Sequence, residues 1–176
     1  MKNNSVRFLT ESAIIAAAYV VLTFVSASMN LAYLPLQFRA SEALTILPIL
    51  TPAAIPGLAV GCFISNLASP MGIIDWIFGT GATLIAALIS YKCRNITVKK
   101  IPVISFLSPV VINALVIGMV ISAVSDLGSF SFTNINIEAF SLWALSVGLG
   151  ELAVIVILGT PLYFTMKKLQ IHQLKK

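Results

Sequence analysis

The chain has 176 residues, of which 59% are hydrophobic and only 10% are charged, and its net charge is +5 at pH 7. Soluble domains carry about 25% charged residues, so this composition argues against a soluble enzyme, a disordered tail and a secreted disulfide-bonded scaffold. Long apolar stretches instead predict an all-α, polytopic membrane protein, and the length predicts a single transmembrane domain over residues 1–176.

Ten of the eleven lysine and arginine residues fall in three clusters. Because cytoplasmic loops collect lysine and arginine, we expect all three clusters, and therefore both chain termini, on the cytoplasmic side. This orientation requires an even number of membrane crossings between neighbouring clusters. The clusters are Lys2 and Arg7; Lys92, Arg94, Lys99 and Lys100; and Lys167, Lys168, Lys175 and Lys176.

The first predicted span covers residues 8–29 and is apolar except for Glu11, which lies one helical turn from Arg7. About twenty residues suffice to span the hydrocarbon core, and this segment is too long for the apolar core of a signal peptide. Its small residues Ala13 and Ala17 are four positions apart, a spacing that lets another helix approach closely. They predict a helix contact in the cytoplasmic half of the membrane.

Between residues 44 and 91 the only charged residue is Asp75, and the length fits either two long spans or three shorter ones. One span precedes this stretch, so an odd number of spans must follow it to return Lys92 to the inside. Three spans are therefore favoured over two. We therefore predict spans over 40–50, 53–68 and 72–91, with a proline-rich turn between the first two. For the GxxxG pattern of Gly57 and Gly61, packing within the chain is the favoured interpretation.

Two further apolar segments, 101–124 and 139–166, bring the predicted total to six spans. The polar segment 126–138 between them is expected to be an external loop. The last segment is longer than a span requires, so we expect it to tilt or to project from the bilayer.

Charged residues inside membrane spans are costly and usually mark a functional site. In the predicted topology, polar side chains from several spans fall in the outer half of the membrane, with Asn113 and Glu151 near its middle. Their common depth predicts a ligand pocket. The candidate pocket residues are Gln37, Arg39, Glu42, Asn66, Asp75, Trp76, Asn113, Trp143 and Glu151.

Most of these candidates also have a purely structural interpretation. Arg39 and Glu42 have the spacing of an ion pair at a helix start, and Asp75 has the position of a cap. The two tryptophans fit the aromatic belt at a membrane interface, and the two asparagines fit hydrogen bonds between helices. Glu151 is hardest to explain in this way, because it lies near mid-depth with no basic residue nearby in sequence.

The sequence gives no support for catalytic or metal chemistry. Cys62 and Cys93 lack CxxC spacing and are expected to be unpaired thiols, and His172 has no neighbouring ligand cluster that would bind a metal. There is no phosphate-binding loop, HExxH or GxSxG motif, so we expect no ATP hydrolysis, no enzyme activity and no cofactor. Together with a deep external pocket, these absences favour a binding subunit that draws energy from partner proteins.

Residues 37–91 strongly resemble the QueT family through the motifs QFRASEALT, TPAAIPGL and GIIDWIFG. The resemblance extends over most of the chain, more loosely in the last two spans. QueT proteins are substrate-binding S components of energy-coupling factor (ECF) transporters, assigned to queuosine precursors. The resemblance implies a six-helix bundle that captures a 7-deazaguanine, such as preQ1, preQ0 or queuine, and delivers it with a transmembrane coupling protein and two ATPases. It also implies that Ala13 and Ala17 form the docking face for the coupling protein.

Two alternatives to a queuosine-precursor subunit remain at this point. One is an S component for another small vitamin-like substrate. The other is a self-sufficient channel or proton-coupled carrier that uses Glu151 and Asp75 as a relay. An integral-membrane enzyme is disfavoured, because no nucleophile is paired with a base.

Overall fold

The computed structural model describes residues 2–32, 38–99, 101–124, 130–131, 133 and 135–174. Over these residues the regular structure is helical, which confirms the all-α prediction; two isolated β-bridges occur and no strand. The segment η1 is a 3-10 helix and η3 is a π-helical stretch that joins α5 to α6. The elements are α1 (Lys2–Ser28), η1 (Ala40–Ile49), α2 (Ala54–Asn66), α3 (Ile73–Lys92), α4 (Val103–Ala123), α5 (Ile137–Val154), η3 (Ile155–Gly159) and α6 (Thr160–Leu174).

Each of the six predicted spans coincides with a helical segment, although only four stretches of the described chain are long and apolar enough to cross a membrane. They are Asn4–Ser28, Ile73–Lys92, Val103–Ala123 and Ile137–Leu169. The other two, η1 with 10 residues and α2 with 13, are shorter apolar helices. Each is about 20 Å long, less than the roughly 30 Å hydrocarbon core. Six crossings and cytoplasmic termini therefore remain predictions.

The loop predicted over residues 126–138 ends earlier in the structure, because α5 begins at Ile137 and Glu138 lies in its first turn. Asn136 caps this helix by accepting a hydrogen bond from the backbone N–H of Glu138. Asp126 and most of the loop before this cap lie outside the described residues, as does Lys100.

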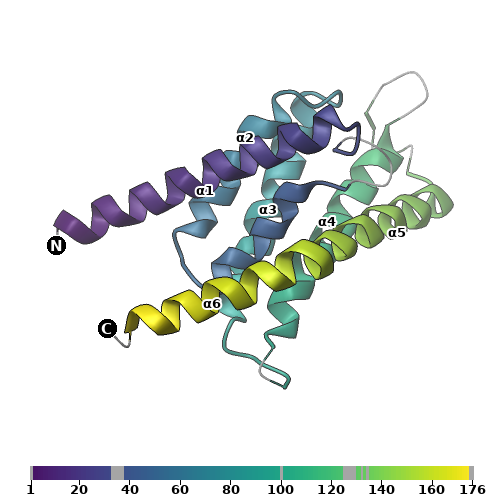
Figure 1. Ribbon diagram of the computed structural model, residues 1–176. Helices are drawn as coiled ribbons and strands as arrows, with labels where there is room; N and C mark the ends of the chain where they lie inside the picture. Colours follow the sequence, from purple (N-terminus) through teal and green to yellow (C-terminus); the bar gives the residue numbers. More distant parts are fainter. Residues whose placement is uncertain are drawn as a thin grey trace.

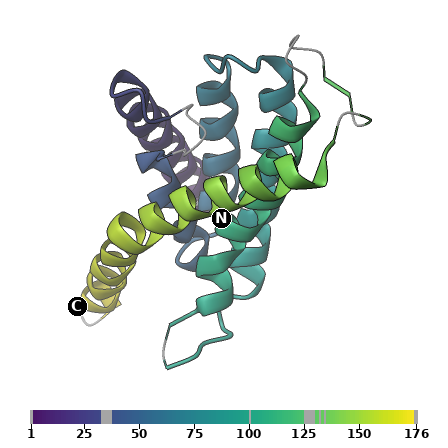
Figure 2. The ribbon, with the colours of Figure 1, turned by 90° about the vertical axis from the view of Figure 1, so that its right-hand side faces the viewer.

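The helices α1 to α5 pack as neighbours in chain order, and η1 contacts every other helix. Figure 1 shows the start of α1 and the end of α6 on the left and the α3–α4 connection at the bottom, while the α2–α3 connection lies at the upper right. Figure 2 again places the α2–α3 and α3–α4 connections at opposite ends of the bundle. Because η1 contacts every other helix and most of its residues are buried, it is enclosed by the helices around it.

Two glycines set how closely α1 and α2 approach. A Cβ on Gly57 would lie 2.7 Å from the Ser12 carbonyl oxygen, and one on Gly61 would lie 2.8 Å from the Tyr19 Cβ and 2.9 Å from the Ala16 carbonyl oxygen. The GxxxG pattern therefore packs within the chain, as predicted. Close approach also lets the Ser12 hydroxyl donate to the Ala53 carbonyl at 2.9 Å.

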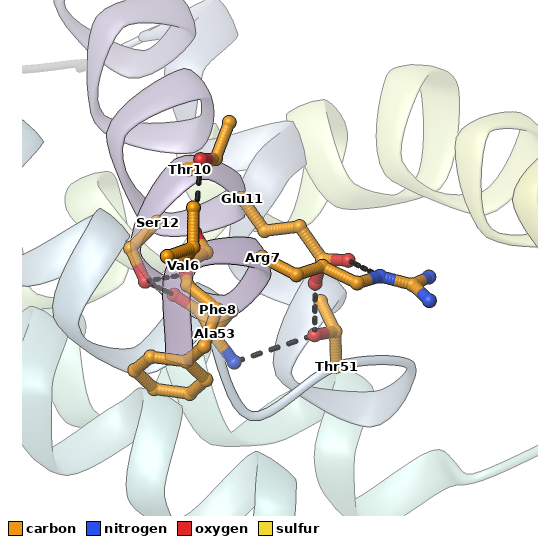
Figure 3. A network of polar contacts seen from close by, with 8 residues as sticks. All are labelled: Val6, Arg7, Phe8, Thr10, Glu11, Ser12, Thr51 and Ala53. Atoms are coloured by element: carbon orange, nitrogen blue, oxygen red, sulfur yellow. Dashed lines mark hydrogen bonds and ion pairs between the residues drawn. The ribbon is translucent and has the colours of Figure 1, made fainter. Parts of the chain in front are cut away.

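A polar network fastens the start of α1 to the turn between η1 and α2 (Figure 3). The Arg7 Nε contacts the Glu11 Oε1 at 2.9 Å, which confirms the expected pairing one helical turn apart. The Thr51 Oγ1 donates to the Glu11 Oε2 at 3.1 Å and accepts from the backbone N–H of Ala53 at 3.3 Å. This end of α1 is thereby linked to the turn that positions η1.

The last long helix is interrupted by the π-helical stretch η3. Pro161 has no backbone N–H, so it cannot donate the α-helical hydrogen bond to the carbonyl four residues earlier. The wider π-helical turn lies directly before this position. The Thr160 hydroxyl bonds the Ile155 carbonyl at 3.1 Å within this stretch. Gly159 lies against η1, where a Cβ would be 3.5 Å from an Ile46 methyl group.

The surface of the bundle is apolar while charged side chains lie inside. Ile14, Ile77 and Leu145 are 63%, 62% and 62% exposed, whereas Glu42 and Glu151 are buried. This is the reverse of a soluble protein and fits a chain surrounded by lipid. Cys62 and Cys93 are free thiols, as predicted.

Candidate functional site

The short helix η1 places two predicted site residues at the centre of the bundle. Arg39 precedes its first turn with an extended backbone, at φ −91° and ψ 110°, and Glu42 lies in that turn. Their exposed fractions are 7% and 4%. Because η1 contacts every other helix, both charged groups are enclosed by protein.

A small cavity lies where η1 meets α2, α3, α4 and α5. Its volume is about 20 Å³, which is room for about one water molecule. The cavity brings together four of the eight predicted pocket residues that the structure describes, although they come from three different parts of the chain. Its lining residues are Arg39, Glu42, Asn113 and Glu151, with Cys62, Gly79, Thr83, Ile117 and Val147.

Two further candidates, Asn66 and Asp75, stand behind Arg39 in a chain of hydrogen bonds. The Arg39 Nη2 donates to the Asn66 Oδ1 at 2.9 Å, and the Asn66 Nδ2 donates to the Asp75 carbonyl oxygen at 3.0 Å. The Asp75 Oδ2 accepts from the Ser69 hydroxyl at 2.6 Å. Gly79 leaves room for this arrangement, since a Cβ there would lie 2.7 Å from the Asn66 Nδ2. Asn66 and Asp75 thus fix the guanidinium without lining the cavity.

Tyr19 belongs to this site and was not among the predicted residues. Its side chain is fully buried, and its hydroxyl donates to the Glu42 Oε1 at 2.5 Å. Next to it, the Thr23 hydroxyl donates to the Ser41 hydroxyl at 2.7 Å. The sequence holds a hint of this role, because Tyr19 follows Ser12 and Ala16 along one face of α1 at helical spacing.

Two carboxyl oxygens at the site have no hydrogen-bond partner among the described residues. They are the Glu42 Oε2 and the Glu151 Oε1, and both are buried. The two carboxyl groups are neighbours, and Asn113 lies beside Glu151. A buried acceptor without a donor is destabilising by about 1–3 kcal/mol, and more for a charged group. The pair is therefore suited to accept hydrogen bonds from a ligand.

The two predicted tryptophans do not line this cavity. Trp76 and Trp143 are half-buried, and the buried Trp76 Nε1 finds no acceptor in the described part of the chain. Gln37 lies outside the described residues.

Comparison with known proteins decides the family. A sequence model described as QueT transporter matches residues 9–168. The chain belongs to the QueT transporter family. The match runs from the second turn of α1 into α6 and so includes all the residues around the cavity.

One curated relative of this QueT family member is the "Queuosine precursor transporter QueT" of Lactococcus lactis subsp. cremoris (strain MG1363). The two are 35% identical over 85 residues, which is 48% of this chain and 50% of that protein. The match thus covers only half of the relative's length. No solved structure matches the chain.

The first helix of this QueT family member has two different small-residue faces. Ser12 and Ala16 are buried against α2, whereas Ala13 and Ala17 are exposed. Contact between α1 and α2 therefore leaves the Ala13–Ala17 face uncovered by the described chain.

Proposed function

We propose that this QueT family member is the substrate-binding S component of an ECF-type importer. In this proposal it captures a queuosine precursor from outside the cell, with six crossings, cytoplasmic termini and a cytoplasmic Lys92–Lys100 loop. A transmembrane coupling protein and two ATPases then drive delivery. The observation that carries the proposal is the pair of buried, partnerless acceptors on Glu42 and Glu151.

A 7-deazaguanine supplies the donors that these acceptors lack. Its ring N–H and exocyclic amino group lie side by side, in the geometry that one carboxylate accepts. Glu151 is the proposed acceptor for this edge, with the amide of Asn113 beside it. Glu42, held by Tyr19 through its other oxygen, is the proposed acceptor for a substituent on the five-membered ring.

The other candidates have supporting roles in the proposal. Arg39 lines the cavity, and Asn66 and Asp75 orient it through their hydrogen bonds. Trp76 and Trp143 are proposed stacking surfaces, and Gln37 is proposed as a further amide contact. A cavity of about 20 Å³ holds no bicyclic base, so we expect helices or side chains around it to move apart on binding.

Ala13 and Ala17 are the proposed docking face for the coupling protein. They are exposed, and their small side chains allow a partner helix to approach the α1 backbone closely. The GxxxG pattern of α2 is already used within the chain, so the exposed alanines are free for such a contact.

Calorimetry on the purified chain tests the substrate proposal. The titrants are 7-aminomethyl-7-deazaguanine, 7-cyano-7-deazaguanine and queuine, with adenine as the control base. Saturable binding of a deazaguanine but not of adenine is expected. Binding of none of the three would refute the assignment, and binding of an unrelated vitamin would favour an S component for another substrate. Copurification of ATPases distinguishes the S component from a self-sufficient carrier.

A further inference from the structure

The groups around the cavity carry more negative than positive charge. Among the described residues, Glu42, Asp75 and Glu151 are the carboxyl groups of the cluster, and Arg39 is its only cation. The remaining titratable groups there are the Tyr19 hydroxyl from α1 and the Cys62 thiol from α2, both neutral in their ordinary state. The helix α4 contributes the uncharged Asn113. With every carboxyl group ionised, the cluster would hold a net charge of about −2 inside the bundle.

The two carboxyl oxygens that lack a hydrogen-bond donor show where a proton that offsets this negative charge would be held. The Glu42 Oε1 is taken by the Tyr19 hydroxyl, and the Asp75 Oδ2 is taken by Ser69. The two oxygens without a donor, one on Glu42 and one on Glu151, belong to neighbouring carboxyl groups. Two adjacent buried carboxylates repel each other, whereas one shared proton provides the missing donor and removes one charge.

We propose that the ligand-free site holds one proton on the Glu42–Glu151 pair and exchanges it for the positive charge of an amine-bearing ligand. The inference rests on the proposed function and specifies the substrate class as a cationic deazaguanine. In the exchange the carboxylic acid O–H breaks and its proton leaves to solvent. The ligand ammonium then donates to the carboxylate, so the charge of the site is unchanged.

Proton release distinguishes a cationic ligand from a neutral one. The ammonium of 7-aminomethyl-7-deazaguanine is charged at neutral pH, as that of lysine is, whereas the nitrile of 7-cyano-7-deazaguanine is neutral. Calorimetry in two buffers of different ionisation enthalpy should give about one proton released for the amine and none for the nitrile. Because binding of the amine requires the pair to lose one proton, Kd for the amine should fall about tenfold for each unit rise in pH over the range in which the pair is protonated. Binding of the nitrile releases no proton, so its Kd should stay constant.

Two variants test whether the proton released on amine binding comes from the Glu42–Glu151 pair. Glu42→Gln removes one member, so amine binding should release no proton and lose its pH dependence. Glu138→Gln, the same change in the exposed first turn of α5, should leave both unchanged. If the Glu42 variant fails to bind, infrared spectroscopy replaces calorimetry. The carbonyl band of a buried carboxylic acid should be present in the ligand-free parent and absent from Glu42→Gln.

The outcomes separate the two proposals. Amine binding without proton release, or a ligand-free parent that lacks the infrared band, overturns proton exchange but leaves precursor binding intact. If no deazaguanine binds while the infrared band is present and sensitive to Glu42→Gln, the protonated pair stands and the proposed substrate is wrong.

Discussion

Replacing Glu151 by glutamine tests the candidate site most directly. The substitution keeps the size of the side chain but turns one acceptor oxygen into an N–H donor, which would face the ligand's own donors. Glu151 is 5% exposed, so bulk solvent does not reach its carboxyl group to compensate for the lost acceptor. Loss of a buried, charge-assisted hydrogen bond is worth about 1.5–3 kcal/mol. Affinity for a 7-deazaguanine should therefore fall by roughly tenfold to more than a hundredfold.

Calorimetry on purified variants measures this loss, and the same helix offers a matched control. Glu138 lies in the first turn of α5 and is exposed, so Glu138→Gln makes the same chemical change away from the cavity. It should bind as the parent does. Parental affinity, within twofold, in the Glu151→Gln variant would remove Glu151 from the site, and the pocket would then have to be built around Asp75 and the segment before η1.

Three further predictions address topology, docking and the residue that sequence reasoning missed. In a cysteine-free background, a cysteine at Thr133 should react with an impermeant reagent from outside and one at Lys99 should not; external labelling at Lys99 would exclude the proposed orientation. The double variant Ala13→Leu/Ala17→Leu adds bulk to the exposed face of α1, so it should block uptake and assembly with the ATPases while substrate binding stays near parental. Normal uptake by that variant, at normal expression, would rule out the docking face. Tyr19→Phe removes the donor to the Glu42 carboxylate, a hydrogen bond worth about 1.5–3 kcal/mol when the acceptor is charged, so the variant should be less stable, and it should bind the ligand more weakly because Glu42 is no longer held in place; unchanged affinity would show that the hydroxyl does not position that carboxylate.

Local sequence features were sufficient to predict where the helices lie. Apolar length and the charge clusters located all six helical segments within a few residues, apart from the earlier start of α1 and the continuation of the last helix to Leu174. The Arg7–Glu11 pair followed from helical spacing alone. These features depend only on residues that are close together in the sequence. Their relative positions are set by helical geometry wherever a helix forms.

Only the tertiary structure decided which faces meet. The helix α1 has apolar residues on every side, so its sequence does not show that Ser12 and Ala16 face α2 while Ala13 and Ala17 stay exposed. The same holds for the site. Glu42 and Glu151 become neighbours because α5 packs against the enclosed η1, and Tyr19 reaches Glu42 because two glycines of α2 let α1 approach. Hydropathy records that a residue enters the membrane, but packing between helices determines which side chains share a cavity.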